Sequence, residues 1–140
     1  MDTGHTLESE RLARRLFSAV ARGVAGELGE LAHPSITLVS TVRPGTEVHG
    51  KDEFVRHVQD TLANSLYEVS ASSFQALDDD RIVVEGRIRW MDDDRVIRDD
   101  SVICAMEFRD GLLARIIPAR TAVEAETILG GMSTEGTPSG

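Results

Sequence analysis

The sequence is short of cysteine and of positive charge, and each shortage narrows what the protein can do. Cys104 is the only cysteine, so no disulfide can form within the chain and nothing calls for an oxidising compartment. The sequence has 15 Lys and Arg residues but 24 Asp and Glu residues, which gives a formal net charge of −9. Nucleic acid and anionic membranes attract proteins through Lys and Arg, so we predict neither as a partner.

Long apolar runs are absent too. No stretch approaches the roughly 18 apolar residues that a membrane span needs. The opening residues, MDTGHTLESERL, place acidic side chains before any apolar stretch, which is the reverse of a secretory signal. We therefore predict a soluble, cytoplasmic protein.

What the chain does have is the composition of one folded domain. Its 140 residues are 41% hydrophobic and 28% charged, as expected of a globular chain long enough to bury a core. We predict one domain over residues 1–129. Residues 130–140, GGMSTEGTPSG, are rich in Gly, Ser, Thr and Pro and are predicted to form a disordered tail.

Apolar residues at helical spacing predict three helices in the N-terminal half. The predicted helices cover residues 6–22, 24–32 and 51–64. Thr6 is the expected N-cap of the first helix, while His33 and Pro34 are expected to end the second. The β-branched segment 35–42 predicts a strand, followed by a turn at Pro44.

From Leu66 to about Arg120, long strand-like stretches are separated by the short turns DDD, DDD and RDG, which predicts four consecutive antiparallel strands. A helical segment over residues 121–129 follows. This order predicts an α+β fold, in which three helices can cover only one face of the curved sheet. A conical cavity between sheet and helices is then a natural ligand site.

The element order resembles the nuclear transport factor 2-like superfamily, and within it the SnoaL-like branch of cone-shaped α+β barrels. Three local signals carry the resemblance: an N-terminal helix followed by a short acidic one before the first strand, "EVHGKDEFVRHV" at the start of the third helix, and the hairpin "EFRDGLLARI". The resemblance covers about residues 5–128. It implies helices of the N-terminal half packed on a curved, mainly antiparallel sheet, and a homodimer formed through the outer sheet face. Members include ketosteroid isomerase-like enzymes, polyketide cyclases, epoxide hydrolase-like enzymes, dehydratases and proteins with no known activity.

Strand parity nominates the side chains that face the cavity, because alternate residues share one face. The predicted cavity rows are Ile82, Val84, Ile88 and Trp90; Arg98, Asp100, Val102, Cys104, Met106 and Phe108; and Leu112, Ala114, Ile116, Pro118 and Arg120. We expect Arg98 and Asp100 at the mouth, with Trp90 across the hairpin and Arg120 beside them if the register permits. The competing interpretation is that Arg98 and Asp100 only solvate the hairpin end.

Glu85, Arg87 and Arg89 form the opposite row, which we expect on a wet outer face or in a polar dimer interface. If the parity is reversed, this row lines the cavity and Glu85 becomes a candidate base. Cys104 is interpreted as a buried core residue rather than a nucleophile.

The histidines and the single tyrosine are the other candidates. His49 precedes the third helix, where a neutral imidazole could act as a base, although a surface position is the plainer interpretation. His33 and His57 are interpreted as surface or helix-edge residues. Tyr67 is either a hydrogen-bond donor to a ligand or an edge aromatic. No two histidines have ligand spacing with a carboxylate, so we predict no metal.

The catalytic residues that the resemblance implies are largely missing. Arg98 and Asp100 have the Arg-x-Asp spacing of epoxide hydrolase-like members but lie one hairpin too late, and Pro118 stands where many family enzymes carry an aspartate. We therefore predict a protein that binds a small, largely apolar organic molecule, with Trp90, Tyr67, Arg120 and Met106 as ligand contacts.

Any activity is expected to be a cofactor-independent isomerisation, cyclisation or dehydration. His49 or Asp100 would be its base, and Arg98 or Arg120 its electrostatic stabiliser. Two alternatives stay open: a non-catalytic binding or sensing module, and a structural dimer whose cone is filled by its own side chains.

Overall fold

The structure, a computed structural model, describes residues 7–39, 46–63, 67–92 and 94–134. Along these ranges the elements are α1 (Glu8–Arg22), α2 (Ala25–Leu31), β1 (Ala32–Val39), β2 (Glu47–His49), α3 (Lys51–Leu62), β3 (Glu68–Ala76), β4 (Arg81–Met91), β5 (Ile97–Arg109), β6 (Leu112–Ala119) and α4 (Ala122–Thr134). The predicted order of helices and strands is confirmed, with the short strand β2 added.

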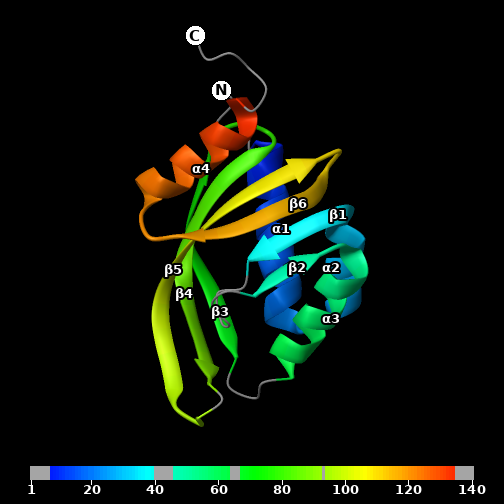
Figure 1. The fold of residues 1–140 in the computed structure, drawn as a ribbon, viewed down its shortest axis with the longest axis vertical. Coiled ribbons are helices and arrows are strands. Elements are labelled where there is room, and N and C mark those ends of the chain that lie inside the picture. The colour runs from blue at the N-terminus through cyan, green and yellow to red at the C-terminus, as the bar shows by residue number, and fades with distance from the viewer. Residues whose placement is uncertain (1–6, 40–45, 64–66, 93, 135–140) are drawn as a thin grey trace, which may run out of the picture.

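The strands form one open, strongly curved sheet in the order β2-β1-β6-β5-β4-β3 (Figure 1). The predicted meander from β3 to β6 is antiparallel throughout, whereas β1 pairs parallel with β6. The α+β class and the curved, mainly antiparallel sheet are therefore confirmed. The sheet does not close into a barrel, since β2 and β3 end it on either side.

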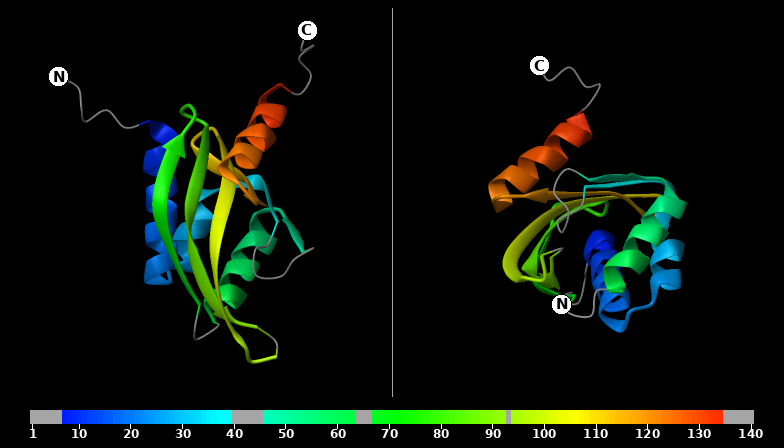
Figure 2. Two further views of the ribbon diagram at one scale, coloured as in Figure 1. Left: turned by 90° about the vertical axis from the view of Figure 1, so that its left-hand side faces the viewer. Right: turned by 60° about the horizontal axis from the view of Figure 1, so that its bottom comes forward.

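The helices lie on both faces of the sheet. In the right-hand view of Figure 2 the sheet curves around α1, α2 and α3, while α4 lies on its outer side. The main core joins Leu16 of α1, Leu28 of α2 and Phe54 of α3 to the concave face of the sheet. A separate small cluster joins Ala125 and Leu129 of α4 to the outer face.

The α1 helix shows why these segments fold as the periodicity predicts. Its buried residues recur on one side, and its exposed side carries ion pairs one turn apart, among them Arg14 with Glu10 at 2.9 Å. It ends at Gly23, whose φ of 70° lies in the left-handed region that favours glycine. The predicted N-cap Thr6 lies outside the described residues.

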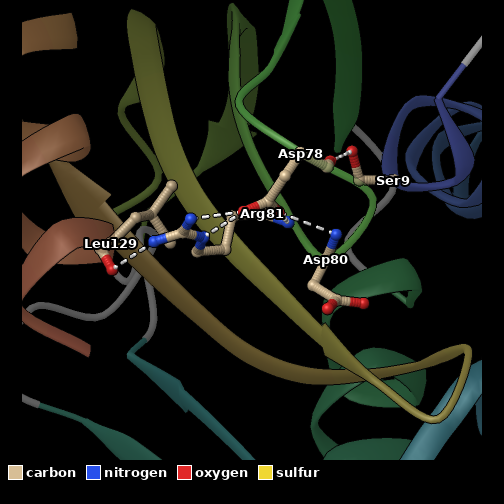
Figure 3. Close-up of polar contacts among 5 residues, drawn as sticks. All are labelled: Ser9, Asp78, Asp80, Arg81 and Leu129. Atoms are coloured by element: carbon tan, nitrogen blue, oxygen red, sulfur yellow. Dashed lines mark hydrogen bonds and ion pairs between the residues drawn. The ribbon is translucent and has the colours of Figure 1, made fainter. Parts of the chain in front are cut away.

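The β3–β4 turn ties both helical layers to the sheet (Figure 3). The buried Ser9 hydroxyl of α1 donates to the Asp78 carbonyl oxygen at 2.6 Å. Arg81 donates through Nε to Asp78 Oδ2 at 2.8 Å and through Nη1 to the Leu129 carbonyl oxygen of α4 at 3.5 Å. The carboxylate of Asp78 also accepts from the backbone N–H of Asp80 at 2.9 Å. This turn therefore connects α1 and α4 through the sheet.

Two irregularities set which side chains face inward. A bulge between Ala71 and Ser73 in β3 lets Phe74 share the inner face with Ala71. The register between β5 and β6 also shifts between Glu107 and Phe108. Met106 pairs with Ile116 on one side of the shift, and Phe108 pairs with Leu113 on the other. The predicted row containing Leu112 and Ala114 is therefore wrong at that end, since Leu113 joins the core instead.

Two element boundaries differ from those predicted. The strand β1 begins at Ala32, so His33 and Pro34 belong to a strand; its ladder is irregular between Ala32 and Thr37, which leaves room for a residue without an N–H. The helix α4 runs to Thr134, so the predicted tail is helical over 130–134. Residues 135–140 and the predicted turn at Pro44 lie outside the described residues.

Candidate functional site

A cavity of about 130 Å³ lies between the concave sheet face and the three N-terminal helices. Its wall is mostly apolar, with Phe17 and Val20 of α1, Leu28 of α2, and Val102 and Met106 of β5 among its residues. No Asp, Glu, Lys or Arg from the described ranges lines it. Its own side chains therefore do not fill the cone, contrary to the structural-dimer alternative.

Five polar residues interrupt this apolar wall. They are His57 and Thr61 of α3, Tyr67 just before β3, Ser70 of β3 and Cys104 of β5. The Thr61 hydroxyl donates to the His57 backbone carbonyl oxygen at 2.9 Å. Because this bond occupies its only proton, Thr61 can offer a ligand lone pairs but no donor.

Tyr67 is placed in the wall rather than as an edge aromatic. Burial, with a smaller contribution from Cys104, raises the pKa of Tyr67 to about 12. The phenol therefore stays protonated at neutral pH. Toward a ligand it is a hydrogen-bond donor, which is the role that the sequence left as one of two interpretations.

Cys104 is a buried free cysteine on the same wall. Burial raises the pKa of its thiol to about 12, so almost no thiolate forms near neutral pH. The interpretation of Cys104 as a core residue rather than a nucleophile agrees with this burial.

His57, interpreted from the sequence as a surface or helix-edge residue, is half-buried and lines the cavity. The inner face of α3 carries Phe54, His57, Val58, Thr61 and Leu62, all of which line the cavity. These positions follow the i, i+3, i+4, i+7 spacing of one helix face. That spacing could have revealed His57 from the sequence, because Phe54 and Val58 had been assigned to the buried face.

The predicted mouth residues lie on the same sheet face as the cavity wall, further along the β4–β5 hairpin. Asp100 is exposed and pairs across the strands with Ile88, which lines the cavity. Trp90 pairs with Arg98, as expected. The Arg98 Nε lies 2.8 Å from Asp92 Oδ2 in the hairpin turn, which is the arrangement expected if Arg98 solvates the hairpin end.

The remaining predicted site residues are dispersed. Met106 lines the cavity. His49 is exposed on β2, with Nε2 3.2 Å from Glu47 Oε1, and is not part of the wall. Arg120 is exposed after β6, where its backbone N–H donates to Glu124 Oε1 at 2.6 Å. Neither His49 nor Arg120 is brought together with Tyr67 and Met106.

The row of Glu85, Arg87 and Arg89 lies on the outer face of the sheet, as strand alternation predicts. Arg87 Nη2 lies 2.8 Å from Asp99 Oδ1, and Arg89 lies 3.7 Å from carboxylate oxygens of both Glu68 and Asp99. Glu85 belongs to this row and is not among the described residues of the wall. The reversed parity, with Glu85 as a cavity base, is therefore wrong.

The described part of the chain lacks two further kinds of feature. No group of three or more His, Cys, Asp and Glu side chains there could hold a metal ion. No helix there is long and apolar enough to cross a membrane.

Solved structures share this architecture at low sequence identity. A Mycobacterium tuberculosis protein in complex with estradiol-17β-hemisuccinate superposes with a TM-score of 0.71 at 11% identity, over 84% of this chain and 97% of its own. A proposed polyketide cyclase from Sinorhizobium meliloti gives 0.65 at 16% identity, over 78% and 94%. An NTF2-like protein from Burkholderia pseudomallei gives 0.68 at 16% identity, over 85% and 95%.

At the level of sequence, a search of curated proteins finds no match. The family model described as SnoaL-like domain matches residues 13–116, from the middle of α1 to the last cavity residue of β6. The matched range thus contains the whole described wall of the cavity. Together with the shared fold, this match places the chain in the SnoaL-like domain family, with a nuclear transport factor 2-like fold.

Proposed function

We propose that this protein binds a small, largely apolar organic molecule whose buried part, inside the cavity, is uncharged. The observation that carries the proposal is the wall itself, which is apolar, has a few polar groups and contains no charged side chain among the described residues. A buried ionic ligand group would have no counter-charge there, which is costly. A neutral ligand would meet no such penalty.

The size of the cavity limits the buried part of the ligand. A dry apolar cavity of roughly 150 Å³ holds one benzene ring. At about 130 Å³, this cavity suits a ligand part of one small ring. A larger molecule would have to project through the mouth.

Tyr67 is the proposed anchor for the polar end of the ligand. Its phenol stays protonated because burial raises its pKa to about 12, so it can donate to a carbonyl or hydroxyl oxygen.

The test is calorimetric titration with phenol and acetophenone. We expect saturable binding of at least one probe, weakened about two- to tenfold by Tyr67→Phe, which removes one hydrogen bond and leaves the ring. Glu85→Gln, on the outer face, serves as the control and should bind as the wild type does. If no neutral one-ring probe binds, the proposed function is overturned.

Proton transfer within the same cavity is a second candidate, favoured by the presence of both His57 and Tyr67 in its wall. A histidine could remove a proton next to a carbonyl group whose oxygen accepts a hydrogen bond from Tyr67. The pair of His57 and Tyr67 differs from the catalytic residues predicted from the sequence, which were His49, Asp100, Arg98 and Arg120. None of those four residues is among the described residues that line the cavity. Of that set, Asp100 is the cross-strand partner of the cavity residue Ile88.

Deuterium exchange at the α-carbon of acetophenone tests this second candidate by NMR. We expect His57→Gln to abolish protein-dependent exchange while probe binding persists. Exchange that persists unchanged in the variant would exclude His57 as the base.

We also propose a homodimer through the part of the outer sheet face that α4 leaves open. Ion pairs of Arg87 and Arg89 lie there, so the association should weaken with salt. Light scattering is expected to give twice the monomer mass at 0.1 M NaCl and less at 1 M, and a monomer mass at both would count against it. The cytoplasmic location stays a prediction.

A further inference from the structure

We propose that the mouth of the cavity holds a subsite for a protonated amine, formed by the carboxylate of Asp100 and the ring of Trp90. This inference rests on the proposed binding function and extends it. The ligand class that it names is an aryl-alkyl amine, with its ring in the cavity and its ammonium group at the mouth.

The first support is the position of Asp100 relative to the wall. Asp100 is the direct cross-strand partner of Ile88, and Val102 follows it by two residues on β5. Both Ile88 and Val102 line the cavity. Direct partners have Cβ atoms about 4.5–5.5 Å apart on one face, so the carboxylate stands just outside the apolar wall.

The second support is that Asp100 has no internal partner. In the part of the chain that the structure describes, its carboxylate makes no hydrogen bond and no ion pair. Its charged neighbours are paired, since Arg98 Nε lies 2.8 Å from Asp92 Oδ2 and Arg87 Nη2 lies 2.8 Å from Asp99 Oδ1. The charge of Asp100 is thus available to a ligand, whereas that of Arg98 is already compensated.

Trp90 supplies the aromatic part of the subsite. It is half-buried and lies two residues beyond Ile88 on the same strand, opposite Arg98. Diagonal positions of this kind are about 7–8 Å apart, within reach of a tryptophan side chain. An ammonium group between the indole and the carboxylate would gain attraction from both.

The spacing and the charge balance define the ligand further. Two residues along a strand span about 6.8 Å, so a linker of two or three carbons joins a ring beside Val102 to an ammonium beside Asp100. An anionic ligand would meet the uncompensated carboxylate and a chain of net charge −9. The expected order of affinity is therefore ammonium, then neutral, then carboxylate.

The test compares three probes that share one ring, at pH 7.5 and low salt: 2-phenylethylamine, 2-phenylethanol and phenylacetate. We expect the amine to bind about two- to fivefold more tightly than the alcohol, the scale of an exposed ion pair, and phenylacetate to bind most weakly. Asp100→Asn should remove the advantage of the amine and leave the affinity for the alcohol unchanged.

Asp99→Asn is the matched control, because Asp99 is the adjacent residue of β5 and pairs with Arg87 on the outer row. It should keep the advantage of the amine. Equal affinities of amine and alcohol in the wild type, or loss of the difference in Asp99→Asn as well, would overturn the subsite alone. Failure of the alcohol to bind would overturn the proposed function and this inference with it.

Discussion

At the scale of single residues, Gly86 determines how closely β3 can approach the cavity wall. A Cβ atom at this position would lie 2.0 Å from the Ser70 carbonyl oxygen, next to the bulge in β3. Gly86 itself lines the cavity. The bulge that turns Phe74 inward therefore depends on the missing side chain.

Gly86→Ala should destabilise the protein by about 1–3 kcal/mol, because the backbone of β3 has to move away. Urea unfolding followed by circular dichroism measures the change. Gly26→Ala is the control, since a Cβ there meets nothing within 4 Å and alanine favours the helix. Equal stabilities of the two variants would contradict the close approach.

Cys104 shows how burial suppresses the reactivity of a thiol. Since its pKa is raised to about 12, we expect iodoacetamide at pH 8 to label the native protein far more slowly than the protein in urea. Mass spectrometry of timed samples measures both rates. Rapid native labelling would mean that the wall around Cys104 opens to solvent.

At the scale of elements, α4 and the three N-terminal helices have separate roles. The inner helices contribute to the cavity, whereas α4 covers Val83 and Ala105 on the outer face through Ala125 and Leu129. Its contacts with the sheet should therefore matter for stability and not for ligand binding.

Leu129→Ala removes a fully buried side chain of α4 and should cost about 2–4 kcal/mol of unfolding free energy. Affinity for a neutral cavity probe should stay unchanged at a temperature where the variant is folded. Val123→Ala is the control on the same helix, since Val123 is 73% exposed and its truncation should change stability by less than about 0.5 kcal/mol. A loss of probe affinity in Leu129→Ala would show that α4 shapes the cavity.

At the scale of the whole molecule, the β3–β4 turn makes the free energy of unfolding depend on pH in the acidic range. The hydrogen bond from Arg81 holds the pKa of Asp78 below its ordinary value of 3.8. The unfolded chain therefore binds a proton at Asp78 before the folded protein does. The stabilisation is complete above the ordinary value and is lost as the pH falls through the lower, folded-state pKa.

Asp78→Asn should accordingly be less stable than the wild type at pH 7 and should lose less stability between pH 5 and pH 2.5. Urea midpoints across this range give the comparison. Asp110→Asn, at an exposed turn, is the control and should follow the wild-type curve. Parallel curves for Asp78→Asn and the wild type would show that the pair contributes nothing to acid sensitivity.

The helices and the meander could be predicted because their signals are local. The stripe in α1 and the alternation in β4 and β5 depend only on residues within a few positions of one another. The short strand β2 could not be predicted in this way, because it forms only by pairing with β1. Pro34 also gave the wrong boundary, since the irregular ladder that accepts it in a strand is a property of the sheet.

By itself, the sequence determined the fold class, the parity of β4 and β5, and Tyr67 and Met106 as candidate contacts. Only the tertiary structure decided that Leu113 rather than Ala114 joins the main core cluster, and that the carboxylate of Asp100 stands beside the wall without an ion-pair partner among the described residues. The physical reason is that periodicity gives the face of an isolated element. Which face meets a cavity, and where a bulge reverses it, depends on contacts between residues far apart in the chain.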